Sequence, residues 1–489
     1  MAENLKEKTV IGVVWSAVQK FGSTAVSFIS TIVLARLLTP EDYGCIGMLS
    51  IFLAVASTFI DGGFGSALIQ KQRPTREDYS TIFYWNFSLS VVLYVILFFS
   101  APAIARFYNL PLLCSVLRVQ GVVLIINAIR IVQTNQLRKQ LKFKKIASVD
   151  LSVAALSLVV TIYLAWKGFG VWALVTQQLM VSVLTTSIYW ITGHWYPLLT
   201  FSMQSFRELF SFGGFILLSN LINTFCNNIQ GLLIGKFYNS ATMGYYSKAK
   251  STEELSSTFI SNIIDQVSYP VLAEAQNDKA YMIRMLRKFI GVLAYVTFPI
   301  MLVLMLIAKP VFVLLYSERW VQSVPYFQIL CFAGIAICLQ GINYNAVAAI
   351  GKSKDLFKWT IIKRLVALCF VVGGLALWGI KGILLGTVFG SFFIYFVNAG
   401  LVSKHVGYTA GQQFKDFLPI LVVSLVACSC SYLVGILLGF NMYVDGLVKL
   451  IVFCTVYFSM SVAFKLEAYQ SAKDVVCSFL NKTKIFKKK

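Results

Sequence analysis

The chain has 489 residues, of which 58% are hydrophobic and 13% are charged, and its mean hydropathy is +0.76. A water-soluble globular protein does not reach that hydropathy, so the composition indicates an integral membrane protein with many spans. The net charge of +22 does not point to nucleic acid as a partner, because the basic residues lie mainly between apolar runs, as the positive-inside rule expects.

The apolar runs predict about fourteen membrane-spanning helices joined by short connections, with no separate soluble domain. With both termini in the cytoplasm, the great majority of the basic residues between spans fall on the cytoplasmic side, among them Arg76, Lys142 and Lys145, so the sequence predicts that orientation. The expected spans of this all-α fold are residues 10–38, 43–69, 79–104, 110–134, 146–166, 169–192, 209–236, 241–270, 284–308, 323–350, 356–378, 380–403, 414–438 and 444–464.

A polar stripe runs along the first predicted span. Its members recur at three- and four-residue steps and therefore share one helix face. A lysine on such a stripe is costly inside hydrocarbon, so we expect the stripe to face protein or a water-filled cavity. The stripe consists of Ser16, Gln19, Lys20, Ser23, Ser27, Ser30 and Thr31.

The same pattern returns 200 residues later. Arg36 aligns with Lys236, Gly44 aligns with Gly244, and the four residues 57–60 are identical to residues 257–260. The second copy begins an even number of spans after the first, so both copies enter the membrane from the same side. The stripe itself aligns with Asn220, Asn223, Thr224, Asn227, Asn228 and Gln230.

A parallel repeat of this kind predicts two pseudo-symmetric bundles around a central cavity, with alternating access between them. We expect an N-terminal bundle at residues 1–205 and a C-terminal bundle at residues 206–405. Two further spans at 406–466 and a basic cytoplasmic tail at 467–489 complete the predicted organisation, and the tail is typical of a surface helix on anionic lipid.

Five basic residues lie inside predicted spans and need a partner there, and an anionic substrate is one. Each also has a plainer interpretation: Lys20 can snorkel to the surface, and Lys250 can pair with Glu254 one helical turn away. The asparagines of the seventh span can contact sugar hydroxyls or hold helices together. The predicted substrate-binding residues are Lys20, Arg130, Arg118, Lys248, Lys250, Gln19, Asn220, Asn223, Asn227 and Asn228. Among them, Arg130 shares a helix face with Asn127 and Thr134, whereas Arg118 lies on a different face.

Three further charged residues are candidates for coupling or gating. Asp61 lies inside the second predicted span and can exchange a proton or hold a cation, although the glycines after it also suggest a helix end. Arg36 and Lys236 lie at the predicted periplasmic ends of the two repeated helices and are candidates for a periplasmic gate. A cation at a helix C-terminus is also favourable in itself.

We expect no catalytic residues, no metal and no cofactor. The ten cysteines are scattered, and Cys428 and Cys430 have no companion ligands in the sequence. The two histidines, His194 and His405, do not supply a catalytic triad. Gly351, Lys352 and Ser353 resemble the end of a phosphate-binding loop but lack its first glycine.

Four stretches together resemble one family, the Wzx-type polysaccharide and O-antigen flippases, and most closely its colanic-acid-exporter-like branch. They are the turn 39–44 after the helix end 35–38, and residues 61–70, 168–174 and 244–249. This family belongs to the MOP superfamily, which also contains MATE exporters and the lipid II flippase MurJ. The resemblance implies transport of a polyprenyl-pyrophosphate-linked oligosaccharide from the cytoplasmic to the periplasmic leaflet of a bacterial inner membrane, with membrane lipids and polysaccharide assembly proteins as candidate partners.

Two alternatives remain, one within transport and one from another class. A cation-coupled multidrug exporter is the first, and a membrane glycan polymerase or ligase is the second. The longest predicted periplasmic connection is only about 15 residues, which is short for a loop that would carry the acid–base groups of such an enzyme. We therefore expect a transporter rather than an enzyme.

Overall fold

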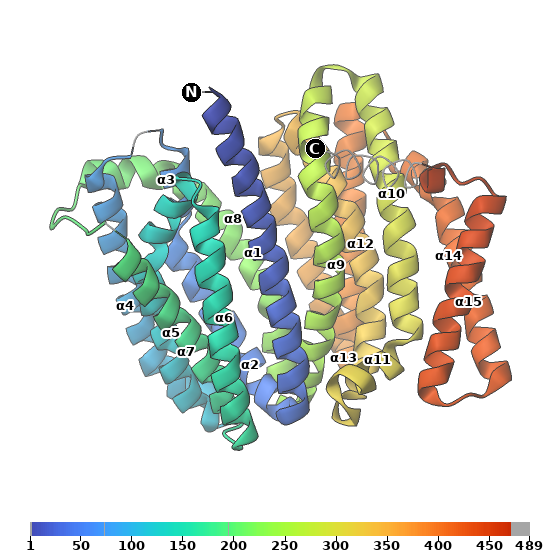
Figure 1. Cartoon of the computed structure of the whole chain (residues 1–489), viewed down its shortest axis with the longest axis horizontal. Coiled ribbons are helices and arrows are strands. Elements are labelled where there is room, and N and C mark those ends of the chain that lie inside the picture. The colour runs from blue at the N-terminus through green and yellow to red at the C-terminus, as the bar shows by residue number, and fades with distance from the viewer. Residues whose placement is uncertain (1, 73, 194, 471–489) are drawn as a thin grey trace. The chain divides into compact units, whose positions relative to one another are not determined.

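The structure is a computed structural model that describes residues 2–72, 74–193 and 195–470. Every regular element in these ranges is a helix, which confirms the all-α class. The chain forms two compact units, Met1–Ser247 and Lys248–Lys489 (Figure 1). His194 and the greater part of the basic tail lie outside the described residues.

Within its described residues, the first unit contains eight helices and the beginning of a ninth. Its strongest packing joins α4 with α5, α1 with α6, α2 with α8, and α5 with α7. The helices are α1 (Ala2–Leu37), α2 (Pro40–Asp61), α3 (Phe64–Gln70), α4 (Arg76–Phe107), α5 (Leu112–Lys139), α6 (Phe143–Trp166), α7 (Val171–Thr192), α8 (Met203–Phe237) and the start of α9 (Ser240–Glu274).

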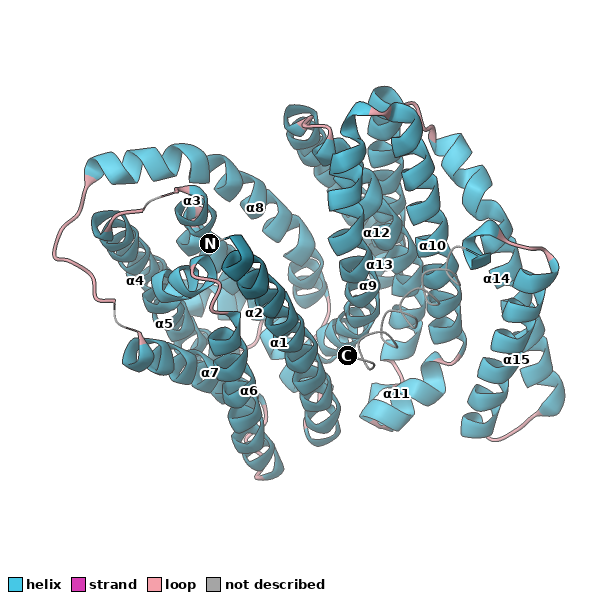
Figure 2. Ribbon diagram, turned by 45° about the horizontal axis from the view of Figure 1, so that its top comes forward, coloured by secondary structure: helices cyan, strands magenta, loops and turns pink. Residues whose placement is uncertain are grey.

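The second unit is built around α12, which packs against α13 and α10, while α14 packs against α10 and α15 (Figure 2). Besides the remainder of α9, its elements are η1 (Ala275–Asn277), α10 (Lys279–Leu306), α11 (Ala308–Tyr316), η2 (Glu318–Trp320), α12 (Ser323–Ala349), α13 (Ser353–Val406), α14 (Ala410–Leu438) and α15 (Met442–Ala463).

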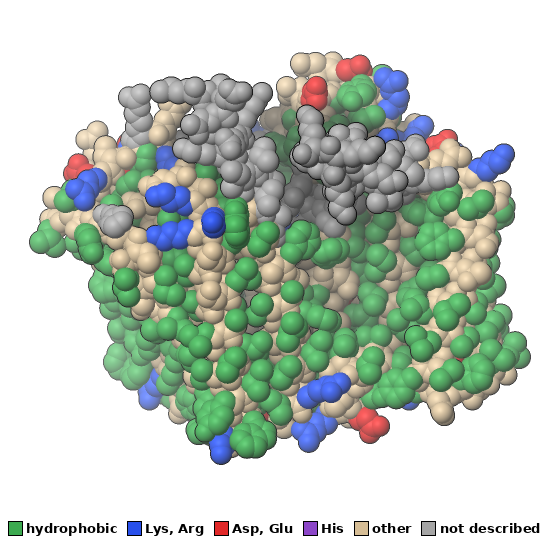
Figure 3. All heavy atoms as spheres, viewed as in Figure 1, with side chains coloured by type: hydrophobic (Ala, Val, Ile, Leu, Met, Phe, Trp, Pro, Cys, Tyr) green, Lys and Arg blue, Asp and Glu red, His purple; other side chains and the backbone are tan. Residues whose placement is uncertain are grey.

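Eleven helices of the described chain are long and apolar enough to cross a membrane, and α8 joins them as a helix bent by 59°. Hydrophobic side chains cover most of the visible flanks, and Lys and Arg side chains gather toward the helix ends (Figure 3). The chain is thus a multi-span membrane protein. The total of fourteen spans stays a prediction. Helix α9 carries four charged residues between 248 and 254 and is not apolar enough to count as a span.

The long helix α13 contains a break that accounts for two of the predicted spans. Trp378 and Gly379 leave helical geometry, with φ of +61° at Gly379, where the sequence predicts a connection between spans 356–378 and 380–403. The two arms pass so close that a Cβ at Gly382 would lie 1.8 Å from the carbonyl oxygen of Gly374. Only glycine permits that approach.

The 200-residue repeat is visible in the helix boundaries. Helix α1 ends at Leu37 and α8 at Phe237, and the following helices begin at Pro40 and Ser240. The two repeats also meet: a Cβ at Gly44 would lie 1.8 Å from the Ser240 carbonyl oxygen, and a Cβ at Gly244 would lie 1.8 Å from the Pro40 carbonyl oxygen. The glycine of each copy therefore allows the first residue of the other helix to approach.

The turn before α2 is a capping box. The backbone N–H of Asp42 donates to Thr39 Oγ1 at 3.4 Å, and the backbone N–H of Thr39 donates to Asp42 Oδ2 at 3.0 Å. These bonds satisfy donors that a helix start leaves free, and Pro40 occupies a position where no N–H is needed. Residues 39–44 thus start α2 and allow the glycine crossing.

The first compact unit includes α8, which the sequence-based division assigns to the second bundle. The compact units are defined by which residues contact one another, whereas the predicted bundles are defined by the sequence repeat, and the two divisions need not coincide. The division into 1–205, 206–405, 406–466 and 467–489 therefore stays a prediction.

Replacing Gly44 or Gly244 by alanine should destabilise the protein, because the added methyl group would overlap a backbone oxygen that cannot rotate away. We expect a loss of about 1–3 kcal/mol or more, as is common for overpacking. The measurement is the thermal melting temperature of the purified protein in detergent. Gly400→Ala is the control, because a Cβ there meets nothing within 4 Å, and equal melting of all three variants would contradict the crossing.

Candidate functional site

The first unit encloses a polar cavity of about 560 Å³ among five helices. Helices α2, α5, α6, α7 and α8 each contribute to its wall, so residues from 57 to 227 meet at one place. The lining is dominated by charged, amide and hydroxyl side chains and consists of Ser57, Thr58, Ile60, Asp61, Leu124, Asn127, Ala128, Arg130, Ile131, Thr134, Asn135, Arg138, Ile146, Asp150, Tyr189, Asn220, Asn223, Thr224 and Asn227.

Two guanidinium groups and two carboxylates face this cavity, namely Arg130, Arg138, Asp61 and Asp150. Asp150 lies near enough to act electrostatically on Arg130, and Arg138 acts in the same way on Asp61. Neither arginine has a hydrogen-bond acceptor among the described residues. Arg130 is partly buried and Arg138 is exposed. Both guanidinium groups are therefore available to an anionic ligand.

Asp150 is held in place by two helices. Gln19 Nε2 donates to Asp150 Oδ2 at 2.6 Å, and Tyr189 Oη donates to Asp150 Oδ1 at 3.3 Å. These bonds join α1 and α7 to α6. The polar stripe of α1 therefore meets protein in part, as predicted, because Gln177 Nε2 also donates to Ser30 Oγ at 3.1 Å.

The asparagine row of α8 forms the opposite part of the wall. Asn220, Asn223 and Asn227 line the cavity, and Thr224 shares a hydrogen bond of 3.0 Å with Thr58 of α2. Asn228 instead donates to the Thr224 carbonyl at 2.8 Å and does not line the cavity. Three of the four predicted asparagines thus occupy the site.

A break between α2 and α3 shapes the cavity beside Asp61. Gly62 and Gly63 both have positive φ, at +55° and +71°, so α2 ends and α3 starts in a new direction. A Cβ at Gly63 would lie 2.5 Å from the carbonyl oxygen of Gly213 in α8. The helix end suggested by the glycines is present, and it leaves the Asp61 carboxylate in the cavity wall.

Several predicted substrate residues lie elsewhere. Lys20 is exposed on α1 and does not line the cavity. Arg118 packs on α4, where its Nε donates to the Phe98 carbonyl at 3.3 Å and its guanidinium lies 4.3 Å from the Phe98 ring centroid. Of these two predicted arginines on α5, the cavity therefore contains Arg130, together with Asn127 and Thr134 from the same helix face.

The two lysines of α9 belong to the second unit. The Lys248 side chain is buried, with its Nζ 4.8 Å from the ring centroid of Tyr316 and 5.0 Å from that of Trp320. Lys250 forms an ion pair with Glu254 at 3.8 Å. Aromatic rings and a neighbouring carboxylate thus stabilise these two cations within the protein.

The two gate candidates lie in the last turns of α1 and α8. Lys236 Nζ donates to the Phe107 carbonyl at 2.9 Å and lies 4.3 Å from the Phe107 ring centroid. Lys236 therefore joins the ends of α8 and α4. A gating role for Arg36 and Lys236 stays a prediction.

The sequence-based selection missed Arg138, Asp150 and Tyr189. Asp150 carries the clearest signal, since a carboxylate inside an apolar helix is rare and usually functional. Arg138 was expected in a cytoplasmic connection, but α5 continues through it to Lys139. No sequence signal distinguishes Tyr189 from the other tyrosines of the chain.

The arrangement can bind a molecule that is both anionic and rich in hydroxyl groups. Arginine N–H groups donate to phosphate or carboxylate oxygens, and asparagine amides supply both donors and acceptors for hydroxyls. Within the described residues, no three His, Cys, Asp or Glu side chains gather as a metal site would require.

A cysteine at Asn220 should react with a water-soluble maleimide in membranes, because the Asn220 side chain is exposed and lines the polar cavity. The measurement is mass-tag labelling in a background without the ten native cysteines. Ser157→Cys is the control, since Ser157 is fully buried on α6. Equal labelling of the two positions would contradict a water-filled cavity.

Comparison with known proteins places the chain among membrane proteins of polysaccharide synthesis. The family model described as "Polysaccharide biosynthesis protein" matches residues 33–325. The teichuronic acid biosynthesis protein TuaB of Bacillus subtilis is 26% identical over 73% of this chain and 74% of its own length. The lipopolysaccharide biosynthesis protein WzxC of Escherichia coli is 23% identical over 89% of both chains.

Two solved structures show the same fold. The lipid II flippase MurJ in an inward closed conformation has a TM-score of 0.76 at 16% identity and covers 92% of this chain and 98% of its own. An inward-facing multidrug resistance MATE transporter of the MOP superfamily has a TM-score of 0.62 at 16% identity, with coverage of 80% and 98%. With the family model matching more than half of its length, the chain belongs to the polysaccharide biosynthesis protein family of membrane proteins.

Proposed function

We propose that this protein is a flippase for a lipid-linked saccharide whose head group carries a phosphate, pyrophosphate or other anionic group. The cargo would move from the cytoplasmic to the periplasmic leaflet of a bacterial inner membrane. The observation that carries the proposal is the cavity of the first unit, where Arg130 and Arg138 have no hydrogen-bond acceptor among the described residues and lie beside a row of asparagines. An anionic sugar head group matches both features, and its polyprenyl tail can remain in lipid.

The relatives support this class of cargo. TuaB and WzxC are named for the biosynthesis of teichuronic acid and lipopolysaccharide, and MurJ is described as a lipid II flippase. A transporter role, rather than catalysis, fits a lining rich in amides that also carries two arginines.

Alternating access between the two repeats is the proposed mechanism, since two related bundles can rock about a site near the bilayer midplane. We propose Asp61 as the coupling group, because its carboxylate shares the cavity with the substrate arginines. Proton or cation binding there would change the net charge that the head group meets. The cytoplasmic position of both termini remains part of this proposal.

Arg130→Gln should abolish or strongly reduce surface polysaccharide while membrane abundance stays normal. Loss of a charge-assisted hydrogen bond costs about 1.5–3 kcal/mol, which corresponds to roughly tenfold or more in head-group affinity. The measurement is surface glycan in a deletion strain that carries the variant, with abundance checked by immunoblot.

Arg118→Gln is the matched control on the same helix, because Arg118 packs against Phe98 outside the cavity. We expect this variant to retain most of the surface glycan. Full export by the Arg130 variant would overturn the cavity as substrate site.

Asp61→Asn should uncouple transport from the ion gradient without removing the substrate arginines. In proteoliposomes, we expect wild-type flipping of a fluorescent lipid-linked saccharide to respond to an imposed pH or sodium gradient, and the Asn variant to lose that response. Lys404 and Asp355 form an ion pair in the second unit, so Asp355→Asn serves as a carboxylate control. An unchanged gradient response in Asp61→Asn would reject this carboxylate as the coupling group.

A further inference from the structure

A second cavity, of about 470 Å³, lies in the first unit at the end that the basic residues predict to be cytoplasmic. It is formed by the start of α4, the end of α5, the connection into α6 and the end of α7 with the residues after it. Its polar and aromatic lining consists of Arg76, Tyr79, Gln133, Gln136, Gln140, Lys142, Lys145, Tyr189, Thr192 and Trp195.

The charge of this second cavity is entirely positive within the described lining. Arg76, Lys142 and Lys145 contribute three cations, and none of them forms an ion pair with a described carboxylate. Lys145 Nζ is oriented by donating to the Thr192 carbonyl at 2.7 Å. Three cations without carboxylates favour an anion with several oxygen atoms, such as a phosphate group.

The remaining lining is suited to a sugar. Gln136 and Gln140 lie one helical turn apart on α5, so their amides face the cavity from one side of the helix. Gln133 shares that side, but its side chain is buried and its amide lies against the Ile129 carbonyl and the Trp190 indole N–H. Tyr79 and Trp195 pack edge to face with ring centroids 6.3 Å apart. The Trp195 indole N–H itself is buried, so Trp195 offers the cavity its ring rather than a hydrogen-bond donor.

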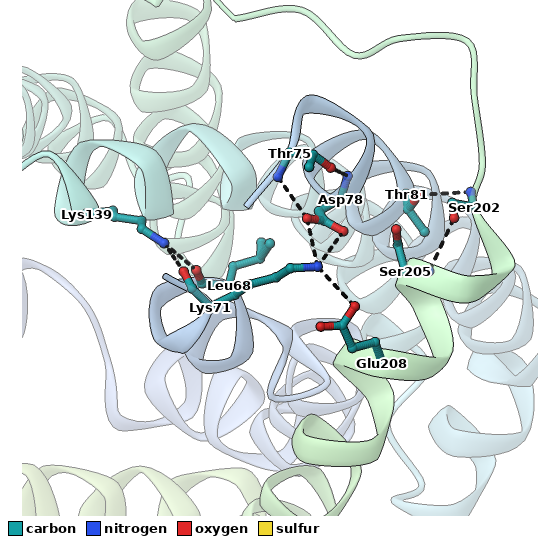
Figure 4. Close-up of polar contacts among 9 residues, drawn as sticks. All are labelled: Leu68, Lys71, Thr75, Asp78, Thr81, Lys139, Ser202, Ser205 and Glu208. Atoms are coloured by element: carbon teal, nitrogen blue, oxygen red, sulfur yellow. Dashed lines mark hydrogen bonds and ion pairs between the residues drawn. The ribbon is translucent and has the colours of Figure 1, made fainter. Parts of the chain in front are cut away.

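A network of hydrogen bonds and ion pairs holds the start of α4 in place (Figure 4). Thr75 and Asp78 form a capping box, and Asp78 also binds Lys71 Nζ at 3.0 Å. Lys71 Nζ reaches Glu208 of α8 at 3.1 Å as well. Burial opposes the charge of Lys71, but its bonds to Asp78 and Glu208 outweigh that cost and raise the pKa of the ammonium, so the network stays ionised at neutral pH.

The end of α5 is fixed by the same network. Lys139 Nζ donates to the carbonyls of Leu68, at 3.1 Å, and Lys71, which lie at the end of α3. One turn after Asp78 on α4, the Thr81 hydroxyl accepts from the Ser202 backbone N–H at 3.0 Å. With both helix ends held, the opposite faces of α4 and α5 present Arg76, Tyr79 and the glutamines to the cavity.

The second cavity adjoins the first across one side chain. Tyr189 lines both, is 2% exposed, and donates to Asp150 on the side of the first cavity. A head group in the second cavity would therefore lie one residue away from the compartment that contains Arg130. The two cavities suit successive positions of one ligand.

We propose that the second cavity is a loading site that binds the phosphorylated saccharide of the cargo at the cytoplasmic surface before it reaches the first cavity. This inference rests on the proposed function for the identity of the cargo. A phospholipid head group shares the phosphate chemistry, but the amide row and the aromatic pair match a saccharide better.

The test uses the full chain in phosphatidylcholine nanodiscs, titrated separately with glucose 1-phosphate, glucose and inorganic phosphate while intrinsic tryptophan fluorescence is recorded. We expect glucose 1-phosphate to bind more tightly than either of the other two. The triple variant R76Q/K142Q/K145Q should weaken its binding by roughly tenfold or more. Equal binding of phosphate and glucose 1-phosphate, or no saturable binding of the sugar phosphate, would overturn the proposal.

The control triple variant K279Q/R284Q/K288Q removes the same residue types from the exposed surface of α10. Binding of glucose 1-phosphate to it should equal binding to the wild type, and an equal loss in both triples would show a general charge effect and overturn the site. A second variant, Q136L/Q140L, should weaken the binding of glucose 1-phosphate but leave the binding of inorganic phosphate unchanged. Loss of both ligands, or of neither, would contradict the sugar-binding role of the amides.

A further titration, with an anionic phospholipid in the nanodiscs, tests whether the cavity binds a lipid phosphate instead. If adding phosphatidylglycerol to the nanodiscs displaces glucose 1-phosphate from the wild type at low mole fraction, the cavity binds phospholipid and the saccharide proposal fails. In cells, the triple variant should slow surface polysaccharide export. Normal export by that variant together with loss in Arg130→Gln would reject the loading site while the proposed function stands.

Discussion

The break between α2 and α3 is the constraint on which both cavities depend. Two consecutive glycines in left-handed geometry end α2 at Asp61, and the backbone of Gly63 passes the carbonyl of Gly213 closer than any side chain would permit. The Asp61 carboxylate is left in the wall of the first cavity, and α3 is directed so that Lys71 reaches Asp78 and Glu208. A continuous helix would move these groups away from the positions they occupy.

The glycine crossing at Gly44 and Gly244 has a similar physical basis at the start of α2. The glycine of each repeat packs against the first helical residue of the other repeat, so the two copies of the duplication touch each other at this point. Away from a water-filled cavity, a membrane protein must satisfy its polar groups internally. The first unit does this with capping boxes, with Gln19 and Tyr189 on Asp150, and with the Thr58–Thr224 bond.

The two cavities differ in charge, and this difference fits the proposed transport step. The first combines two arginines with two aspartates, whereas the described lining of the second contains cations without carboxylates. An anionic head group is attracted most strongly at the second cavity. At the first, carboxylates beside the arginines lower that attraction, which favours release once the protein has changed conformation.

The sequence alone determined the membrane class, the helical fold and the 200-residue repeat. Hydropathy and periodicity are local properties of the chain, and a bilayer requires long apolar helices whatever their later packing. It also determined the chain break near Gly379 and the choice of Arg130 with Asn127 and Thr134 as one helix face. Only the tertiary structure decided which polar residues share a cavity. Lys248 lies among aromatic rings and Arg118 lies on Phe98, while Arg138, Asp150 and Tyr189 meet Arg130. Helical periodicity gives the face on which a residue lies, but the partner of that face is set by packing between helices distant in sequence.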